Sequence, residues 1–386
     1  MRSVLEEARD VTMRRLTNIF HLGIKELRSL YRDPVMFIFI IFSFTVMIYL
    51  AGKGVSMELH NAPIAVVDED HSPLSQRITS AFYGPSFKTP DMIDIAEVDA
   101  VMDAGIYTFV LDIPPNFQRD ILAGKHPEIQ VNVDATQMSQ AFIGAGYIQN
   151  ITQGEITEFM QGHRADTILP IKLITRMRFN PSLTSAWFGG VMELINIITL
   201  LSIILTGAAL IREREHGTLE HLLVMPLTPF DIMLSKVWAM GLVVLVAAAL
   251  SLNFMIEGVL KMPIAGSVPL FLLGTAIFLF STTSLGILLG TIARTMPQLG
   301  LLMILIIMPL QMLSGGSTPY ESMPEFVQVT MQFAPTSHFV RIAQAILYRG
   351  AGLDVVWPDL VANIVIGMVF FFGALALFRK SLATVQ

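Results

Sequence analysis

The sequence predicts an α-helical polytopic membrane protein with six transmembrane helices and an inserted mixed α/β extracytoplasmic domain. Of the 386 residues, 53% are hydrophobic and only 15% are charged, and the mean hydropathy is +0.62. Such an excess of apolar side chains is typical of chains that face lipid. Uncharged stretches long enough to cross a bilayer recur along the chain, and a polar interval of domain length follows the first of them. These observations exclude a simple soluble protein.

The first apolar stretch, Val35 to Ala51, follows a mixed polar segment, and no small-residue cleavage pattern comes close behind it. We therefore expect a membrane anchor rather than a cleaved signal peptide. The predicted parts are a cytoplasmic helix at 1–33, the first span at 34–51, an outer domain at 52–183 and the other spans within 184–386. Those five spans are expected at Trp187 to Ile211, Ile232 to Ile256, Val268 to Ala293, Pro297 to Gln311 and Val361 to Phe378.

Lys and Arg in the short flanking segments predict the orientation, because these residues gather on the cytoplasmic side. Thirteen of them lie on the side of the two chain ends, whereas the short loops of the opposite side hold only Lys261, Arg341 and Arg349. Both termini are therefore expected in the cytoplasm. The outer interval carries 9 basic and 16 acidic residues, which outweighs the net charge of −6. No overall basic field points to nucleic acid as a partner.

An amphipathic helix is predicted within residues 1–33. Apolar residues from Leu16 to Tyr31 share one helical face, and the opposite face carries Lys25, Glu26 and Arg28. Such a helix lies in the cytoplasmic membrane interface, either as a plain anchor or also as a contact for a cytoplasmic partner.

The outer interval alternates strand and helix patterns, which predicts a mixed α/β domain with its own core. It carries no catalytic signature, and the acidic loop after Val67 is a solvated turn rather than a metal site. Strands are expected at 62–68, 106–113, 128–133 and 171–179, and helices at 72–83, 97–104, 114–124 and 136–162.

The segment 212–227 joins the second and third spans and combines charge with a short amphipathic pattern. Arg212, Glu213 and Glu215 precede Gly217, and Thr218 can cap a helix that Pro226 ends. This pattern suits a docking element, although a polar loop that obeys the positive-inside rule accounts for the same charges.

Four motifs in this order resemble those of ABC-2 type permeases, the membrane subunits of ATP-binding cassette exporters. They are IREREHGTLEHLLVMPLTPFDIMLSK from Ile211, RFNP from Arg178, SGGSTPYESMP from Ser314 and APTSHFVR from Ala334. The resemblance covers nearly the whole chain and is closest to multidrug-type efflux permeases with one large outer domain between spans one and two. It implies a multi-pass protein of the bacterial inner membrane.

The resemblance also implies partners and site residues. A separate cytoplasmic ATPase would bind ATP and Mg²⁺, so no cofactor is expected on this chain, and a second permease copy would form a homodimer or a paralogous heterodimer. Residues 1–33 match the connecting helix, and 314–356 match an outer re-entrant segment. Residues implied in coupling to the ATPase are Arg212, Glu213, Glu215, Gly217, Thr218 and Glu220, and those implied in the outer gate are Met323, Pro324, Pro335 and His338.

Two motifs resemble an ATPase signature and a zinc-binding motif, but neither predicts that function. Leu313 to Ser317 reads LSGGS, close to an ATPase signature, but no GxxxxGK[ST] phosphate loop exists in the chain. The two histidines of HGTLEH, His216 and His221, are five positions apart and do not share a helical face, so they predict no zinc site. We expect neither catalytic nor metal-binding residues.

Polar residues inside spans are costly and are therefore candidates for a translocation pathway. Glu193, Asn196 and Asn253 are the residues we select. The alternative for Glu193 is a place at headgroup depth, where it pairs with a neighbouring chain.

The sequence thus favours a permease subunit that exports drug-like or amphipathic substrates and is driven by a separate ATPase. A lipid or glycan exporter of the same family remains an alternative, as does a membrane-anchored receptor or scaffold with an extracytoplasmic binding domain. We further hypothesise that the outer domain contacts a periplasmic membrane-fusion adaptor. The sequence does not identify the substrate.

Overall fold

The computed structural model describes residues 2–54, 59, 61–134, 136, 138–161, 179, 184–215, 217, 227–316, 318 and 320–383. The chain divides into two compact units, and each is described by itself. The membrane unit comprises residues 1–55 and 178–386, and the outer unit comprises residues 56–177.

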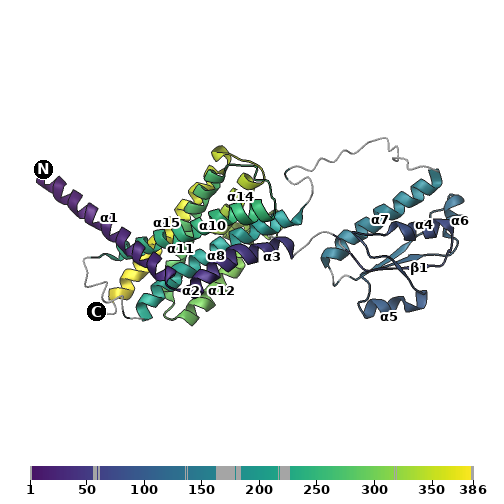
Figure 1. Cartoon of the computed structure of the whole chain (residues 1–386), viewed down its shortest axis with the longest axis horizontal. Helices are drawn as coiled ribbons and strands as arrows, with labels where there is room; N and C mark the ends of the chain where they lie inside the picture. The colour runs from purple at the N-terminus through teal and green to yellow at the C-terminus, as the bar shows by residue number, and fades with distance from the viewer. Residues whose placement is uncertain are drawn as a thin grey trace. The chain divides into compact units, whose positions relative to one another are not determined.

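All regular secondary structure in the described residues of the membrane unit is helical (Figure 1). A π-helical turn, Ser43–Met47, joins α2 to α3, and a second π-helical segment, Leu252–Val259, extends α10. The helices are α1 (Arg2–Tyr31), α2 (Pro34–Phe42), α3 (Ile48–Lys53), α8 (Ser185–Glu215), α10 (Pro229–Ser251), α11 (Val268–Ile292), α12 (Met296–Met312), α13 (Glu325–Met331), α14 (Pro335–Leu347) and α15 (Leu353–Ala383).

Five helical stretches of the described residues are long and apolar enough to cross a membrane. They are Pro34–Lys53, Ser185–Glu215, Pro229–Val259, Val268–Ile292 and Leu353–Lys380. The remaining predicted span, the fifth in chain order, corresponds to α12, an apolar helix of 17 residues. At 1.5 Å per residue it is about 25 Å long, slightly less than the hydrocarbon core of a bilayer.

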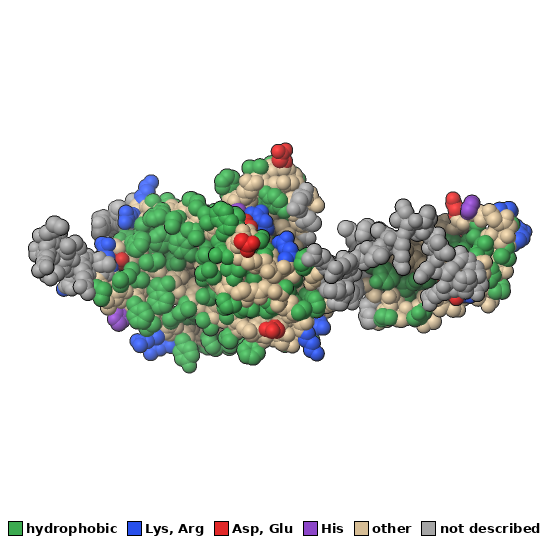
Figure 2. Space-filling view, turned by 90° about the horizontal axis from the view of Figure 1, so that it is seen from above, with side chains coloured by type: hydrophobic (Ala, Val, Ile, Leu, Met, Phe, Trp, Pro, Cys, Tyr) green, Lys and Arg blue, Asp and Glu red, His purple; other side chains and the backbone are tan. Residues whose placement is uncertain are grey.

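Helix α8 lies at the centre of the membrane unit, because 83% of its most apolar window is buried, against 28% for the first span. It packs on α11 through small residues: a Cβ atom on Gly286 would approach the Ile203 carbonyl oxygen to 2.7 Å. Ser202 also donates a hydrogen bond to Thr282 at 2.7 Å. On the face displayed in Figure 2, hydrophobic side chains cover most of this unit, and Lys and Arg gather towards its two ends.

The outer unit is a four-stranded sheet in the order β2-β1-β3-β4. Strands β1 and β3 pair in parallel, and β4 joins β3 in the antiparallel sense. Its helices bury Leu74, Phe117 and Ile148 in one core with apolar residues of the sheet, and Phe82, directly after α4, joins the same core. The elements are β1 (Ile64–Asp68), α4 (Pro73–Ala81), β2 (Asp91–Met92), α5 (Val98–Asp103), β3 (Phe109–Ile113), α6 (Phe117–Leu122), β4 (Gln130–Val133) and α7 (Met138–Gln161).

The predicted mixed α/β domain is confirmed, with shorter elements than the sequence pattern suggests. Ser72 caps α4 as expected, since its hydroxyl accepts a hydrogen bond from the Ser75 amide at 3.1 Å. The two-residue strand β2 was not predicted, because it is too short to show alternation. The strand expected at 171–179 lies outside the described residues except for Phe179.

Candidate functional site

Helix α1 is attached to the first half of α10 by an aromatic contact. The ring of Phe20 stacks on Trp238 with centroids 5.9 Å apart, and the Trp238 indole donates a hydrogen bond to the Ile19 carbonyl at 3.2 Å. A Cβ atom on Gly23 would lie 2.0 Å from the same indole, so glycine is required for this approach. Helix α1 is therefore packed on the membrane unit along part of its length.

Four charged side chains meet where α1, α8 and α10 converge, and we call them the four-charge cluster. Lys236 of α10 lies 2.7 Å from the Glu26 carboxylate of α1 and 2.8 Å from the Glu213 carboxylate of α8. Lys25 also donates to Glu213 at 2.8 Å. Glu26 is 6% exposed and Lys236 1%, so the face that the sequence assigns to charged residues is buried at Glu26. The reason is the buried ammonium of Lys236, which offsets the cost of removing the carboxylate from water.

The cluster is electrically balanced, with two ammonium groups and two carboxylates. Burial raises the pKa of Glu26, against the lowering effect of Lys236. Burial alone would lower the pKa of Lys25, but its hydrogen bond to Glu213 outweighs that effect and the pKa is raised. Each buried charge therefore depends on a partner that belongs to another helix.

The other charges of the 212–215 turn bind neighbouring elements as well. Arg212 pairs with Asp33, the cap of α2, at 3.1 Å. Arg214 donates to the Ala293 carbonyl at 2.8 Å, and Glu215 accepts from the Met296 amide at 3.3 Å. Residues 212–215 form the last turn of α8. Their contacts with Asp33 before α2, and with Ala293 and Met296 between α11 and α12, stabilise this turn as helix.

Beyond this turn the chain changes direction. Gly217 has a φ of 65°, a left-handed conformation that favours glycine and ends helices. The remaining residues that the sequence selects for coupling, Thr218 and Glu220, lie outside the described residues. The structure thus brings Glu213 into the four-charge cluster and leaves the side chain of Glu215 exposed.

Two of the three pathway candidates lie together, and the third does not join them. The Asn196 amide is 3.5 Å from the Glu193 carboxylate on α8, and Gln311 of α12 donates to the Asn196 carbonyl at 3.1 Å. Asn253 lies exposed on the π-helical part of α10, where it donates to Ala249.

The residues selected for the outer gate surround the start of α14. Met323 is 6% exposed, whereas Pro324 is exposed and caps α13. Pro335 is the buried first residue of α14. His338 is 8% exposed and its Nδ1 lies 2.7 Å from Asp359 of α15.

Asp359 also binds Arg341, whose Nε and Nη2 atoms donate to the same carboxylate oxygen at 3.0 and 2.7 Å, respectively. The carboxylate thus connects α14 to α15 and lies within hydrogen-bond distance of two basic side chains. Sequence analysis missed Asp359, Lys236 and Asp33. Their only sequence signal is a charge at the edge of an apolar stretch, which does not indicate the partner.

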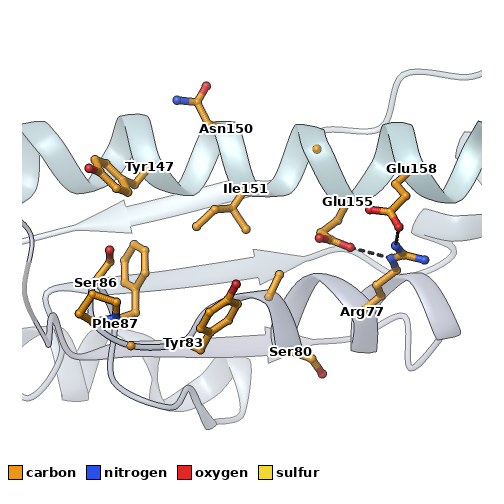
Figure 3. A pocket seen from close by; sticks show the side chains of 14 residues that line it. Arg77, Ser80, Tyr83, Ser86, Phe87, Tyr147, Asn150, Ile151, Glu155 and Glu158 are labelled. Atoms are coloured by element: carbon orange, nitrogen blue, oxygen red, sulfur yellow. Dashed lines mark hydrogen bonds and ion pairs between the residues drawn. The ribbon is translucent and has the colours of Figure 1, made fainter. Parts of the chain in front are cut away.

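The outer unit contains a separate cavity of about 840 Å³ between α4 and α7. Figure 3 shows Arg77 of α4 facing Glu155 and Glu158 of α7, with Tyr83 and Tyr147 further along the cavity. The Arg77 ion pairs measure 2.6 and 2.5 Å, so the two carboxylates are engaged in holding α4 to α7. Among the described residues no three His, Asp or Glu side chains come together as a metal site.

Comparison with known proteins gives a consistent result over most of the chain. Residues 34–376 match the family model described as "ABC-2 family transporter protein". The chain is 61% identical over 372 residues to the inner membrane transport permease YhhJ of Escherichia coli strain K12, covering 96% of this chain and 100% of the relative.

Two more distant relatives come from the same organism. The probable multidrug ABC transporter permease YbhR is 30% identical over 359 residues, which is 92% of this chain and 96% of the relative. The probable multidrug ABC transporter permease YbhS is 27% identical over 365 residues, covering 91% of this chain and 94% of the relative.

Proposed function

The chain belongs to the ABC-2 family of transporter proteins, and we propose that it exports amphipathic, drug-like molecules across the inner membrane. It is the multi-pass permease of an ABC transporter and not itself an ATPase. The naming of the relatives YbhR and YbhS as probable multidrug permeases supports this substrate class.

An ABC permease implies an ATPase partner, and we propose that this ATPase docks where α1 and the end of α8 meet. The four-charge cluster is the observation that carries the proposal, because it joins these two helices to α10 through buried ion pairs. A displacement of α1 or of the chain after Gly217 would therefore be transmitted to two spans. Nucleotide binding by the ATPase would then shift the permease between inward-closed and outward-open populations.

The docking proposal is tested with Glu215→Lys, because that carboxylate is exposed and outside the cluster. The permease is co-expressed with its ATPase, and both co-purification and substrate-stimulated ATP hydrolysis are measured. We expect both to fall well below wild type. Asp354→Lys is the matched control, since it reverses an exposed carboxylate at the start of α15. Unchanged assembly and hydrolysis in Glu215→Lys would remove the docking assignment.

We propose that the pathway is lined by two permease copies and that Glu193 and Asn196 contact the substrate. Their proximity on α8 supports a shared polar site within the span. Glu193→Gln is expected to reduce the efflux of a cationic dye from inverted vesicles more than that of a neutral dye. An equal effect on both dyes would contradict a role of Glu193 in recognising the charge of the substrate. Asn253→Ala is the control, because Asn253 is a polar residue remote from Glu193 and Asn196.

Both termini are proposed to be cytoplasmic and the outer unit periplasmic, where it would meet a membrane-fusion adaptor. The chain lacks cysteine, so single-cysteine variants can be labelled without background. In intact spheroplasts, a membrane-impermeant maleimide should label Lys88→Cys, which is exposed in the outer unit, and not Arg294→Cys. The reverse pattern would invert the topology. Efflux that survives excision of the outer unit, with correct insertion, would remove the adaptor proposal.

A further inference from the structure

A second polar site lies at the opposite end of α8 from the four-charge cluster. A cavity of about 470 Å³ opens between the start of α8, the turn after α12, and α14. Its polar lining includes Ser314, Ser337, Arg341, Gln344 and Arg349, while Phe188 and Val340 provide apolar surface.

The charged lining of this cavity is positive. Arg341 and Arg349 line it, and no carboxylate does so among the described residues. Arg341 directs its Nε and Nη2 atoms to Asp359, outside the lining, and its guanidinium carbon lies 6.0 Å from the Tyr320 ring centroid. Arg349 is exposed and forms no ion pair within the described residues. The cavity therefore retains uncompensated positive charge.

The hydroxyl of Ser337 is the second, independent observation. Ser337 lines the cavity and is 1% exposed, yet its Oγ makes no hydrogen bond with any described residue. A buried hydroxyl without a partner costs free energy, so such groups commonly face a ligand or water. Ser337 is also the third residue of α14, a helix of 13 residues whose first-turn amides lack intrahelical acceptors.

We propose that this cavity binds a phosphate group carried by a larger molecule. A phosphate accepts hydrogen bonds from a guanidinium and a hydroxyl at the same time, which matches Arg349 and Ser337. The cavity is larger than a free phosphate, and Phe188 and Val340 can contact the apolar part of the molecule that carries it. A phospholipid headgroup and a phosphorylated solute share this chemistry. The inference does not depend on which substrate the permease exports.

The full-length protein is purified in detergent and titrated with dioctanoyl phosphatidylglycerol, with dioctanoylglycerol and with inorganic phosphate, and bound ligand is counted by native mass spectrometry. We expect phosphatidylglycerol to bind and the uncharged dioctanoylglycerol to bind much more weakly. Arg349→Gln should lower the phosphatidylglycerol affinity about tenfold, as expected for one charge-assisted contact. Ser337→Ala should lower it about threefold, through one neutral hydrogen bond.

The matched control is Arg294→Gln, which removes an exposed arginine at the other end of the membrane unit and should leave the affinity unchanged. Competition by inorganic phosphate would identify a soluble phosphate compound as the ligand, and its absence would identify the lipid headgroup. Equal binding of phosphatidylglycerol by wild type and Arg349→Gln, or equal binding of dioctanoylglycerol and phosphatidylglycerol, would overturn the proposal. Failure of the ATPase docking tests would not affect this result.

Discussion

The two ends of α8 use charge in different ways. At one end, Glu213 shares a buried ammonium with Glu26, and every member of the four-charge cluster has an opposite partner. At the other end, the carboxylate of Asp359 is the partner of both His338 and Arg341. Arg349 has no carboxylate partner in the described part of the chain. In this cluster the shared partner matters most, because removing Lys236 would leave the Glu26 carboxylate buried without its ammonium partner. An exposed, unbalanced charge contributes little to folding and is free to bind a ligand.

Lys236→Met should produce the largest effect, because it leaves Glu26 and Glu213 buried without their shared partner. A loss of about 3 kcal/mol or more in stability is expected. The measurement is the midpoint of thermal unfolding of the purified protein, followed by size-exclusion chromatography.

Lys25→Met is the matched comparison, since Lys25 binds the same Glu213 but its side chain is 49% exposed. Its effect should stay within about 1 kcal/mol. Similar losses of stability in Lys25→Met and Lys236→Met would show that the difference in burial between the two lysines does not determine their contributions.

Asp359→Asn should have the next largest effect, at the opposite end. Arg341 and His338 would lose the negative charge of their common partner, at a cost of about 1 to 3 kcal/mol in stability. Because the substitution also removes the charge that neutralises Arg341, phosphatidylglycerol affinity should rise. Thermal unfolding measures the loss of stability, and native mass spectrometry measures the phosphatidylglycerol affinity. A fall in affinity would contradict the electrostatic account of the cavity.

The pH dependence of stability provides a further test of the four-charge cluster, through Glu26. Burial raises the folded-state pKa of Glu26, so the folded protein holds this proton more tightly than the unfolded chain. Its contribution to stability is therefore largest below the ordinary pKa of 4.5 and is lost as the pH rises through the folded-state pKa. Unfolding midpoints measured upward from about pH 4 should show this loss in wild type and a flatter profile in Glu26→Gln. Identical profiles would exclude Glu26 as its source.

Arg349→Gln should have the smallest effect on stability, within about 0.5 kcal/mol, because the side chain is exposed and no described carboxylate pairs with it. Thermal unfolding without added lipid checks this. A loss comparable to that of Asp359→Asn would mean that Arg349 has a structural role.

Local patterns were sufficient for much of the fold. The long apolar stretches identified the spans, and Ser72 marked the start of α4 correctly, because a helix cap acts within one turn of the chain. Helix α15 begins at Leu353, before the predicted Val361, since Asp354 and Pro358 interrupt the apolar pattern without ending the helix.

The candidate site was less accessible to sequence reasoning. Glu26 and Lys236 lie 210 positions apart, and no periodicity relates them. The sequence therefore placed Glu26 beside Lys25 on the charged face of the helix without indicating a buried partner. Gly23 belongs to the predicted apolar face of this helix, and only the structure shows that its missing side chain allows the Trp238 ring to approach α1.

By itself, the sequence determined which segments enter the membrane, that a mixed α/β unit is inserted after the first span, and which family the chain resembles. These properties follow from hydropathy, short-range signals and motifs that are local in the chain. Only the tertiary structure decided which charges are partners. It placed Glu213 in a buried cluster and left Arg349 beside an open cavity, because ion pairing depends on distances between helices that are remote in sequence.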